Sequence, residues 1–134
     1  MKLENNWQQK SLEMLEKKNI GFPKNENSRL VNEVLRLRKI PLNQFTIEDI
    51  RLMIGQNEGL GYIIVLAINA LKIDLFAEGD MYPGDLLKNV LNIESTFWLE
   101  HKESWIAINN LIKNKINLIQ EHNISTEIFY SALN

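Results

Sequence analysis

The sequence predicts an all-α fold: a single-domain multi-helix bundle around a buried central helix. Apolar residues recur at spacings of three and four along most of the chain, which is the period of an amphipathic helix. Ser or Thr precedes several of these stretches, where a side-chain oxygen can cap a helix. Residues 62–73 are apolar on almost every side. The 134 residues, 45% of them hydrophobic, have the composition of one globular domain, so we expect residues 1–134 to form a single domain.

Two helices are predicted in the N-terminal part of the chain. A loose apolar stripe over residues 2–19 predicts the first, and Gly21-Phe22-Pro23 ends it. Ser28 can cap the second, and Pro41 stops it. The expected buried face of the second helix consists of Leu30, Val31, Val34, Leu35 and Leu37. Its basic residues are expected to face water: Arg29, Arg36, Arg38 and Lys39.

A third helix and the central helix follow. Thr46 precedes the third helix, and its hydroxyl can accept a backbone hydrogen bond from the first turn. The central helix is residues 62–73, YIIVLAINALKI, and twelve residues are too few to span a bilayer. Their β-branched side chains leave a strand open as an alternative. The lack of alternation, with Ala67, Ala70 and Leu71, favours a helix.

Four helical segments are predicted after the central helix. Pro83 suits the first turn of a helix over residues 83–92, because its missing N–H would be unpaired there. Ser95 is expected to cap a short helical turn. Regular apolar spacing predicts a long amphipathic helix over residues 101–121, and Ser125 is expected to cap the last helix.

Charge is distributed unevenly along the chain. Residues 1–40 carry a net charge of +4 and residues 41–100 carry −6, within an overall charge of −2. An acidic middle region is poorly suited to nucleic acid, which requires clustered Lys and Arg. We therefore expect no direct nucleic-acid binding and a basic partner instead. The other interpretation is that these acids form a solvated face together with helix caps.

The composition disfavours several kinds of chemistry. The chain has no Cys, which excludes disulfides, thiolate nucleophiles and cysteine metal sites and fits a reducing compartment, which we expect to be the cytoplasm. No apolar run predicts a signal peptide or a membrane span, so we expect no membrane contact. His101 and His122 lack a second metal ligand at helical spacing, and no Ser lies in a Gly-x-Ser-x-Gly motif. We expect no cofactor, no metal and no catalytic residues.

The segment over residues 77–87 combines ionisable side chains with residues that are typical of turns. Glu78, Asp80, Tyr82 and Asp85 lie there with two glycines and a proline, directly after the apolar central helix. One interpretation is structural: Asp80 and Tyr82 cap a turn, and Asp85 lies where a helix dipole favours an anion. The others are a contact with a partner, or catalysis and metal binding. As candidate partner-binding residues we name Glu58, Asp74, Glu78, Asp80, Tyr82 and Asp85.

Several separated motifs, in this order, carry a family resemblance over roughly residues 35–105. They are Ile40-Pro41-Leu42, FTIEDIRLMIGQ at residues 45–56, Gly59-Leu60 with Tyr62, AEGD at residues 77–80, YPGDLL at residues 82–87, and Phe97-Trp98. With these motifs the chain resembles the immunity proteins of bacterial contact-dependent growth inhibition (CDI) systems.

The resemblance implies a cytoplasmic protein that binds and neutralises the C-terminal toxin domain delivered by a neighbouring cell. Such toxins are commonly nucleases that attack RNA. The resemblance brings no catalytic residues, and it predicts neither the interface nor the oligomeric state. One alternative is an RNA- or nucleotide-processing enzyme that holds a divalent metal with Glu78, Asp80 and Asp85. Another is a structural subunit of a larger assembly.

Overall fold

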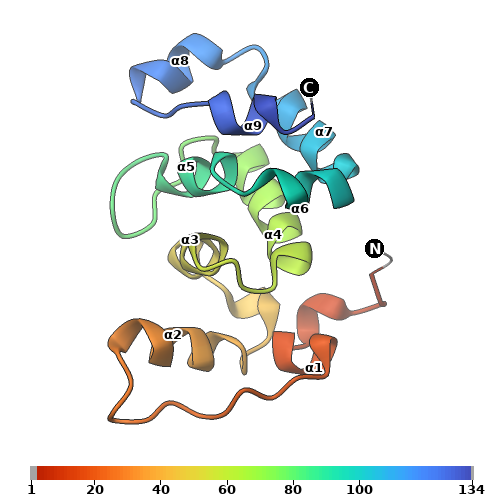
Figure 1. The fold of residues 1–134 in the computed structure, drawn as a ribbon, viewed down its shortest axis with the longest axis vertical. Coiled ribbons are helices and arrows are strands. Elements are labelled where there is room, and N and C mark those ends of the chain that lie inside the picture. The colour runs from red at the N-terminus through yellow and green to blue at the C-terminus, as the bar shows by residue number, and fades with distance from the viewer. Residues whose placement is uncertain (1–2, 134) are drawn as a thin grey trace. The chain divides into compact units, whose positions relative to one another are not determined.

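The structure is a computed structural model that describes residues 3–133. In this range it contains nine α-helices, two short 3-10 helices and no strand (Figure 1). The helical share is 60%, so the all-α prediction is confirmed. The chain divides into two compact units, residues 1–46 and 47–134. The expectation of a single domain over residues 1–134 stays a prediction.

The first unit is built from two α-helices and two 3-10 helices. They are η1 (Trp7–Gln9), α1 (Leu12–Glu16), α2 (Arg29–Leu37) and η2 (Leu42–Gln44). The continuous helix expected over residues 2–19 is wrong; residue 2 lies outside the described part. Ser11 is in extended conformation and accepts a hydrogen bond from the Met14 N–H, so it caps α1 and interrupts the helical run. Lys17 then ends α1 in the left-handed region, with φ of 53°.

The buried face of α2 is narrower than its sequence indicates. Leu35 and Leu37 are buried, whereas Leu30 and Val31 are 42% and 46% exposed. Arg38, expected to face water, is only 3% exposed. Its guanidinium donates to Glu16 at 2.7 Å, which balances the buried charge. The prediction for Arg38 was wrong because α1 folds back over the end of α2.

The second unit surrounds the predicted central helix. Its helices are α3 (Ile47–Gly55), α4 (Leu60–Ile73), α5 (Asp85–Leu91), α6 (Ser95–Glu100), α7 (Lys102–Ile112), α8 (Ile116–Glu121) and α9 (Glu127–Ser131). Helix α4 packs against α3, α5 and α7. It buries Ile63, Ile64, Ala67, Ile68 and Leu71, which confirms the buried central helix.

An aromatic cluster joins α6, α7 and α9. The Trp105 ring stacks on Phe129 at 4.9 Å between centroids, and its indole N–H donates to the Phe129 carbonyl at 3.0 Å. Trp98 contacts the Phe129 ring edge-on at 5.3 Å. Trp98 and Phe129 are completely buried. The edge-on contact of the buried Trp98 ring with Phe129 holds the short α6 against α9.

The helices predicted over residues 101–121 and 83–92 have different bounds in the structure. The helix expected over residues 101–121 is divided into α7 and α8, because Lys115 leaves the helical region and its N–H bonds to the Ile112 carbonyl at 2.8 Å in a tight turn. Pro83 lies outside α5. It pairs with Glu78 in an isolated β-bridge, and Gly84 precedes the helix with φ of 90°.

The predicted serine caps have different outcomes. The Ser28 hydroxyl accepts from the Val31 N–H at 3.1 Å, and the Ser125 hydroxyl accepts from the Glu127 N–H at 3.2 Å. Ser28 therefore caps α2 as expected. The N-cap of α9 is Thr126, so Ser125 lies one residue before the cap position and the prediction for Ser125 was wrong. Ser95 does not cap its helix either, because α6 already begins at Ser95 and Glu94 precedes it.

The burial of Arg38 predicts a contrast between two arginines of the same segment. Arg38→Ala removes a buried guanidinium and its bond to Glu16, so we expect the free energy of unfolding to fall by about 1–3 kcal/mol. Arg36 pairs with Glu33 at the surface, and Arg36→Ala is the matched control, with a change within about 0.5 kcal/mol. Urea denaturation of both variants measures the difference. Equal losses would contradict the structural role of Arg38.

Candidate functional site

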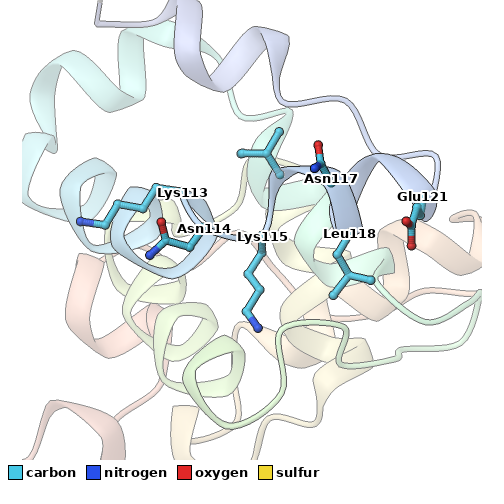
Figure 2. Close-up of a pocket in the computed structure, with 7 residues that line it drawn as sticks. Lys113, Asn114, Lys115, Asn117, Leu118 and Glu121 are labelled. Carbon is cyan, nitrogen blue, oxygen red and sulfur yellow. The ribbon is translucent and has the colours of Figure 1, made fainter.

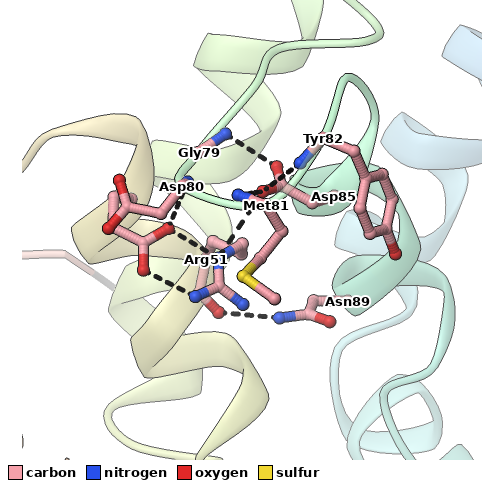
Figure 3. A network of polar contacts seen from close by, with 8 residues as sticks. Arg51, Gly79, Asp80, Met81, Tyr82, Asp85 and Asn89 are labelled. Atoms are coloured by element: carbon pink, nitrogen blue, oxygen red, sulfur yellow. Dashed lines mark hydrogen bonds and ion pairs between the residues drawn. The ribbon is translucent and has the colours of Figure 1, made fainter.

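The loop between α4 and α5 is organised around the carboxylate of Asp85. This side chain is 2% exposed. One oxygen, Oδ1, accepts from the Gly79 N–H at 2.7 Å, and Oδ2 accepts from the N–H groups of Met81 at 3.0 Å and Tyr82 at 3.4 Å (Figure 3). A buried carboxylate is costly unless it is hydrogen-bonded, and here it satisfies backbone donors that the loop would otherwise leave unpaired.

Helix α3 supplies the other side of this network. The Asp80 N–H donates to Glu48 Oε1 at 2.8 Å. Arg51 donates to both oxygens of Glu48, from Nε at 2.6 Å and from Nη2 at 2.5 Å, and its Nε lies 3.7 Å from Asp85 Oδ2. A single guanidinium thus balances two carboxylates. Together, Glu48 and Asp85 accept from four consecutive backbone N–H groups, over residues 79–82.

The same contacts shift two pKa values. The hydrogen bond from Arg51 holds the pKa of Glu48 below its usual value, and the Asp80 N–H lowers it further, while burial opposes the shift. The hydrogen bond to Glu48 raises the pKa of Arg51. Each partner therefore favours the charged form of the other.

Glycines allow the loop to approach this network closely. A Cβ on Gly79 would lie 2.6 Å from Glu48 Oε1 and 3.1 Å from Asp85 Oδ2, inside the space that the carboxylates occupy. Gly84 has φ of 90°, which favours glycine, and a Cβ there would lie 3.0 Å from Ile124 Cδ1. Gly79 therefore permits the close approach to the carboxylates, and Gly84 permits the turn that precedes α5.

The loop directs its remaining side chains to solvent. Glu78 and Asp80 are exposed. Met81 is 65% exposed and Tyr82 is 38% exposed, and the Tyr82 ring points away from the polar network (Figure 3). Lys88 Nζ lies 5.9 Å from the centre of that ring. The result is an acidic and apolar surface on a hydrogen-bonded frame, which we call the acidic loop (residues 78–82).

The six residues named from the sequence lie in different environments. Glu78, Asp80 and Tyr82 are on the acidic loop, and Asp74 is exposed at the end of α4, where it accepts from the Phe76 N–H at 3.0 Å. Glu58 is half-buried in the turn between α3 and α4. Asp85 is buried beneath the loop, so it shapes the surface instead of forming part of it.

Sequence reasoning missed three residues of the network. They are Glu48, Arg51 and Asn89, whose side chain donates to the Arg51 carbonyl at 2.9 Å. The spacing of Glu48 and Arg51 on one helix does signal an ion pair. Nothing local indicates that Glu48 also binds Asp80, because these residues are 32 positions apart in the chain.

The geometry offers little for catalysis. Among residues 3–133, no three His, Asp or Glu side chains form a group that could hold a metal ion. Both oxygens of Asp85 already accept backbone hydrogen bonds. A recess of about 400 Å³ lies at the junction of α7 and α8, but the side chains that line it diverge: Lys113, Lys115 and Glu121 point in different directions (Figure 2).

These features define a class: a small helical protein with an acidic, hydrogen-bonded loop exposed to solvent. The family model for CDI immunity proteins matches residues 14–108, most of the chain. The chain belongs to this family, and its function is immunity against a CDI toxin. No curated protein and no solved structure matches it. Within the described residues, no helix is long and apolar enough to cross a membrane.

The matched range contains both halves of the polar network. It includes α3, which carries Glu48 and Arg51, and the whole segment from Gly79 to Asp85. Three of the motifs that carry the resemblance, at residues 45–56, 77–80 and 82–87, thus meet in space at the base of the acidic loop.

The close packing around Gly79 predicts that a single methyl group disrupts the loop. Gly79→Ala should lower the free energy of unfolding by about 1–3 kcal/mol, because the added Cβ displaces Glu48 or Asp85. Gly55→Ala is the control. Its Cβ would lie 3.0 Å from the Asn89 amide, at the end of a side chain that can shift without moving either carboxylate, and Ala favours a helix, so we expect a smaller loss than for Gly79→Ala. Chemical denaturation compares the two variants, and an unchanged Gly79→Ala protein would argue against the network.

The lowered pKa of Glu48 predicts how its contribution depends on pH. Because folding favours the carboxylate, its stabilising effect is present above the ordinary pKa of 4.5 and is lost as pH falls through the lower folded value. Glu48→Gln should therefore cost most stability at neutral pH and progressively less in acid. Denaturation of both proteins across this range provides the measurement. A pH-independent cost would mean that the ion pair contributes nothing.

Proposed function

We propose that this immunity protein neutralises its toxin by placing the acidic loop against a basic surface of the toxin domain. The observation that carries the proposal is the loop itself: Glu78 and Asp80 expose carboxylates beside the exposed Met81 and Tyr82, while four backbone N–H groups hold its shape. A toxin that cleaves RNA needs a basic cleft to hold phosphates, and such a cleft complements this charge. The proposed toxin is therefore a nuclease, and occlusion of its cleft is the mechanism.

Preorganisation supports a role of the loop in binding. A flexible loop loses conformational freedom when it binds, whereas the hydrogen-bonded loop has already lost most of it. Tyr82 and Met81 offer apolar contact area, and aromatic residues are enriched among those that contribute most to affinity. The carboxylates contribute mainly to the rate of encounter.

The other named acids have different proposed roles. Asp74 follows α4 and lies close in sequence to the acidic loop, so it adds to the same negative field. Asp85 acts through the loop, by fixing the backbone of Met81 and Tyr82. Glu58 lies beyond the C-terminal end of α3, away from the network at Glu48.

We further propose that the protein has no enzymatic activity and does not bind nucleic acid directly. The absence of cysteine supports a reducing compartment, and the cytoplasm is the proposed site of action. These proposals agree with the negative charge over residues 41–100.

The contribution of the loop carboxylates to the association rate can be tested by neutralising them. For the variant E78Q/D80N we expect the association rate with the purified toxin domain to fall about tenfold at low salt, because electrostatic steering is lost. The difference should shrink as salt rises, since screening already removes the steering. Surface plasmon resonance over a salt series measures both rates.

The matched control is E103Q/E121Q, which removes two exposed acids outside the acidic middle region. It should associate at nearly the wild-type rate. Association that is equally fast in the loop variant, with an unchanged salt dependence, would refute the role of the loop. A toxin domain without nuclease activity on RNA or DNA would refute the occlusion of a nucleic-acid cleft.

A further inference from the structure

A second recess lies at the opposite end of α3 and α5 from the acidic loop. Its volume is about 240 Å³, and Leu60, Ile93 and Phe97 form its apolar wall. Glu94 and Glu100 also line it, with two neutral polar residues. No cationic side chain lines this recess in the part of the chain that the structure describes. It therefore combines an apolar wall with uncompensated negative charge.

The two carboxylates of this recess are free. Glu94 precedes α6 and Glu100 is its last residue, so they lie at the two ends of one short helix. Both are exposed, and the structure gives neither a hydrogen bond nor an ion pair within residues 3–133. The negative charge of Glu100 adds to the partial negative charge at the C-terminal end of α6. A cation in the recess would meet carboxylates from both ends of the helix.

Phe97 supplies an aromatic wall that is held in place. Its ring stacks on His101 at 4.1 Å between centroids, with 13° between the planes, and it contacts the Trp98 ring edge-on at 5.2 Å. Trp98 is completely buried and belongs to the aromatic cluster with Phe129. An aromatic ring fixed beside two carboxylates provides cation–π attraction as well as charge.

These features match the chemistry of one side chain. Arginine has an aliphatic stem that packs against residues such as Leu60 and Ile93, and a planar guanidinium whose five N–H groups can bond to several carboxylate oxygens at once. It also stacks on aromatic rings more readily than lysine. Charge complementarity thus selects a basic side chain, and the combination of an aromatic wall with two acids selects arginine.

We propose that this recess receives an arginine side chain of the toxin domain. The inference rests on the proposed function, and it adds a second contact to the one at the acidic loop. Helix α3 has nine residues and is about 13 Å long at 1.5 Å per residue. A standard interface covers roughly 800 Å² on each partner, so one toxin domain is large enough to reach both ends of α3.

The test uses the intact protein and its purified toxin domain. E94Q/E100Q keeps the size of both side chains and removes their charge. We expect its affinity for the toxin to fall at least about tenfold. The loss should appear mainly as faster dissociation, because the arginine in the recess would no longer bond to two carboxylates in the formed complex. The control E103Q/E121Q should keep the wild-type affinity. Circular dichroism verifies that the variants are folded.

A double-mutant cycle identifies the partner residue. One Arg→Ala variant of the toxin should weaken binding to the wild-type protein but cause little further loss with E94Q/E100Q. Wild-type affinity of E94Q/E100Q, or additive losses for every toxin arginine, overturns the proposal. If E78Q/D80N loses affinity while E94Q/E100Q does not, the proposed arginine contact in the recess is refuted and the proposed function stands. If the wild-type protein does not bind the toxin, the proposed function itself fails.

Discussion

The buried carboxylate of Asp85 is the interaction on which the acidic loop depends. A charge that is 2% exposed is unfavourable in isolation, but here three backbone N–H groups and the nearby guanidinium of Arg51 compensate for it. The carboxylate in turn gives partners to N–H groups that no sheet or helix satisfies. The loop keeps one shape because departure from it would leave both the charge and the donors unpaired.

This arrangement separates the residues that hold the loop from those that face the solvent. Glu48, Gly79 and Asp85 lie at the base, where a change of size or charge affects the backbone. The side chains of Met81 and Tyr82 are exposed to solvent, and the Tyr82 ring points away from the base (Figure 3). Substitutions at the outward positions can therefore alter the surface that we propose as the toxin contact without disturbing the frame. For a protein that must match one toxin, this division allows specificity and folding to be changed independently.

The recess beside α6 places further negative charge near the other end of α3. Its acids are not needed to satisfy backbone donors, in contrast to Asp85, and the stacked rings of Phe97 and His101 hold its wall. Unpaired carboxylates in a defined recess are available to a partner, whereas paired carboxylates stabilise the fold. The distinction follows from hydrogen bonding, because Asp85 and Glu94 are the same chemical group in different surroundings.

The helical class, the central helix α4 and the acidic segment could all be predicted from the amino-acid sequence, because these depend on periodicity, composition and local capping, as at Ser28. The sequence also carried the family motifs. Only the tertiary structure decided that α7 and α8 are separate, that Arg38 is buried against Glu16, and that Asp85 supports the loop. The bonds from Arg38 to Glu16 and from Asp80 to Glu48 join residues 22 and 32 positions apart. Local rules extend about one helical turn along the chain, so pairings of this kind are set by packing between elements.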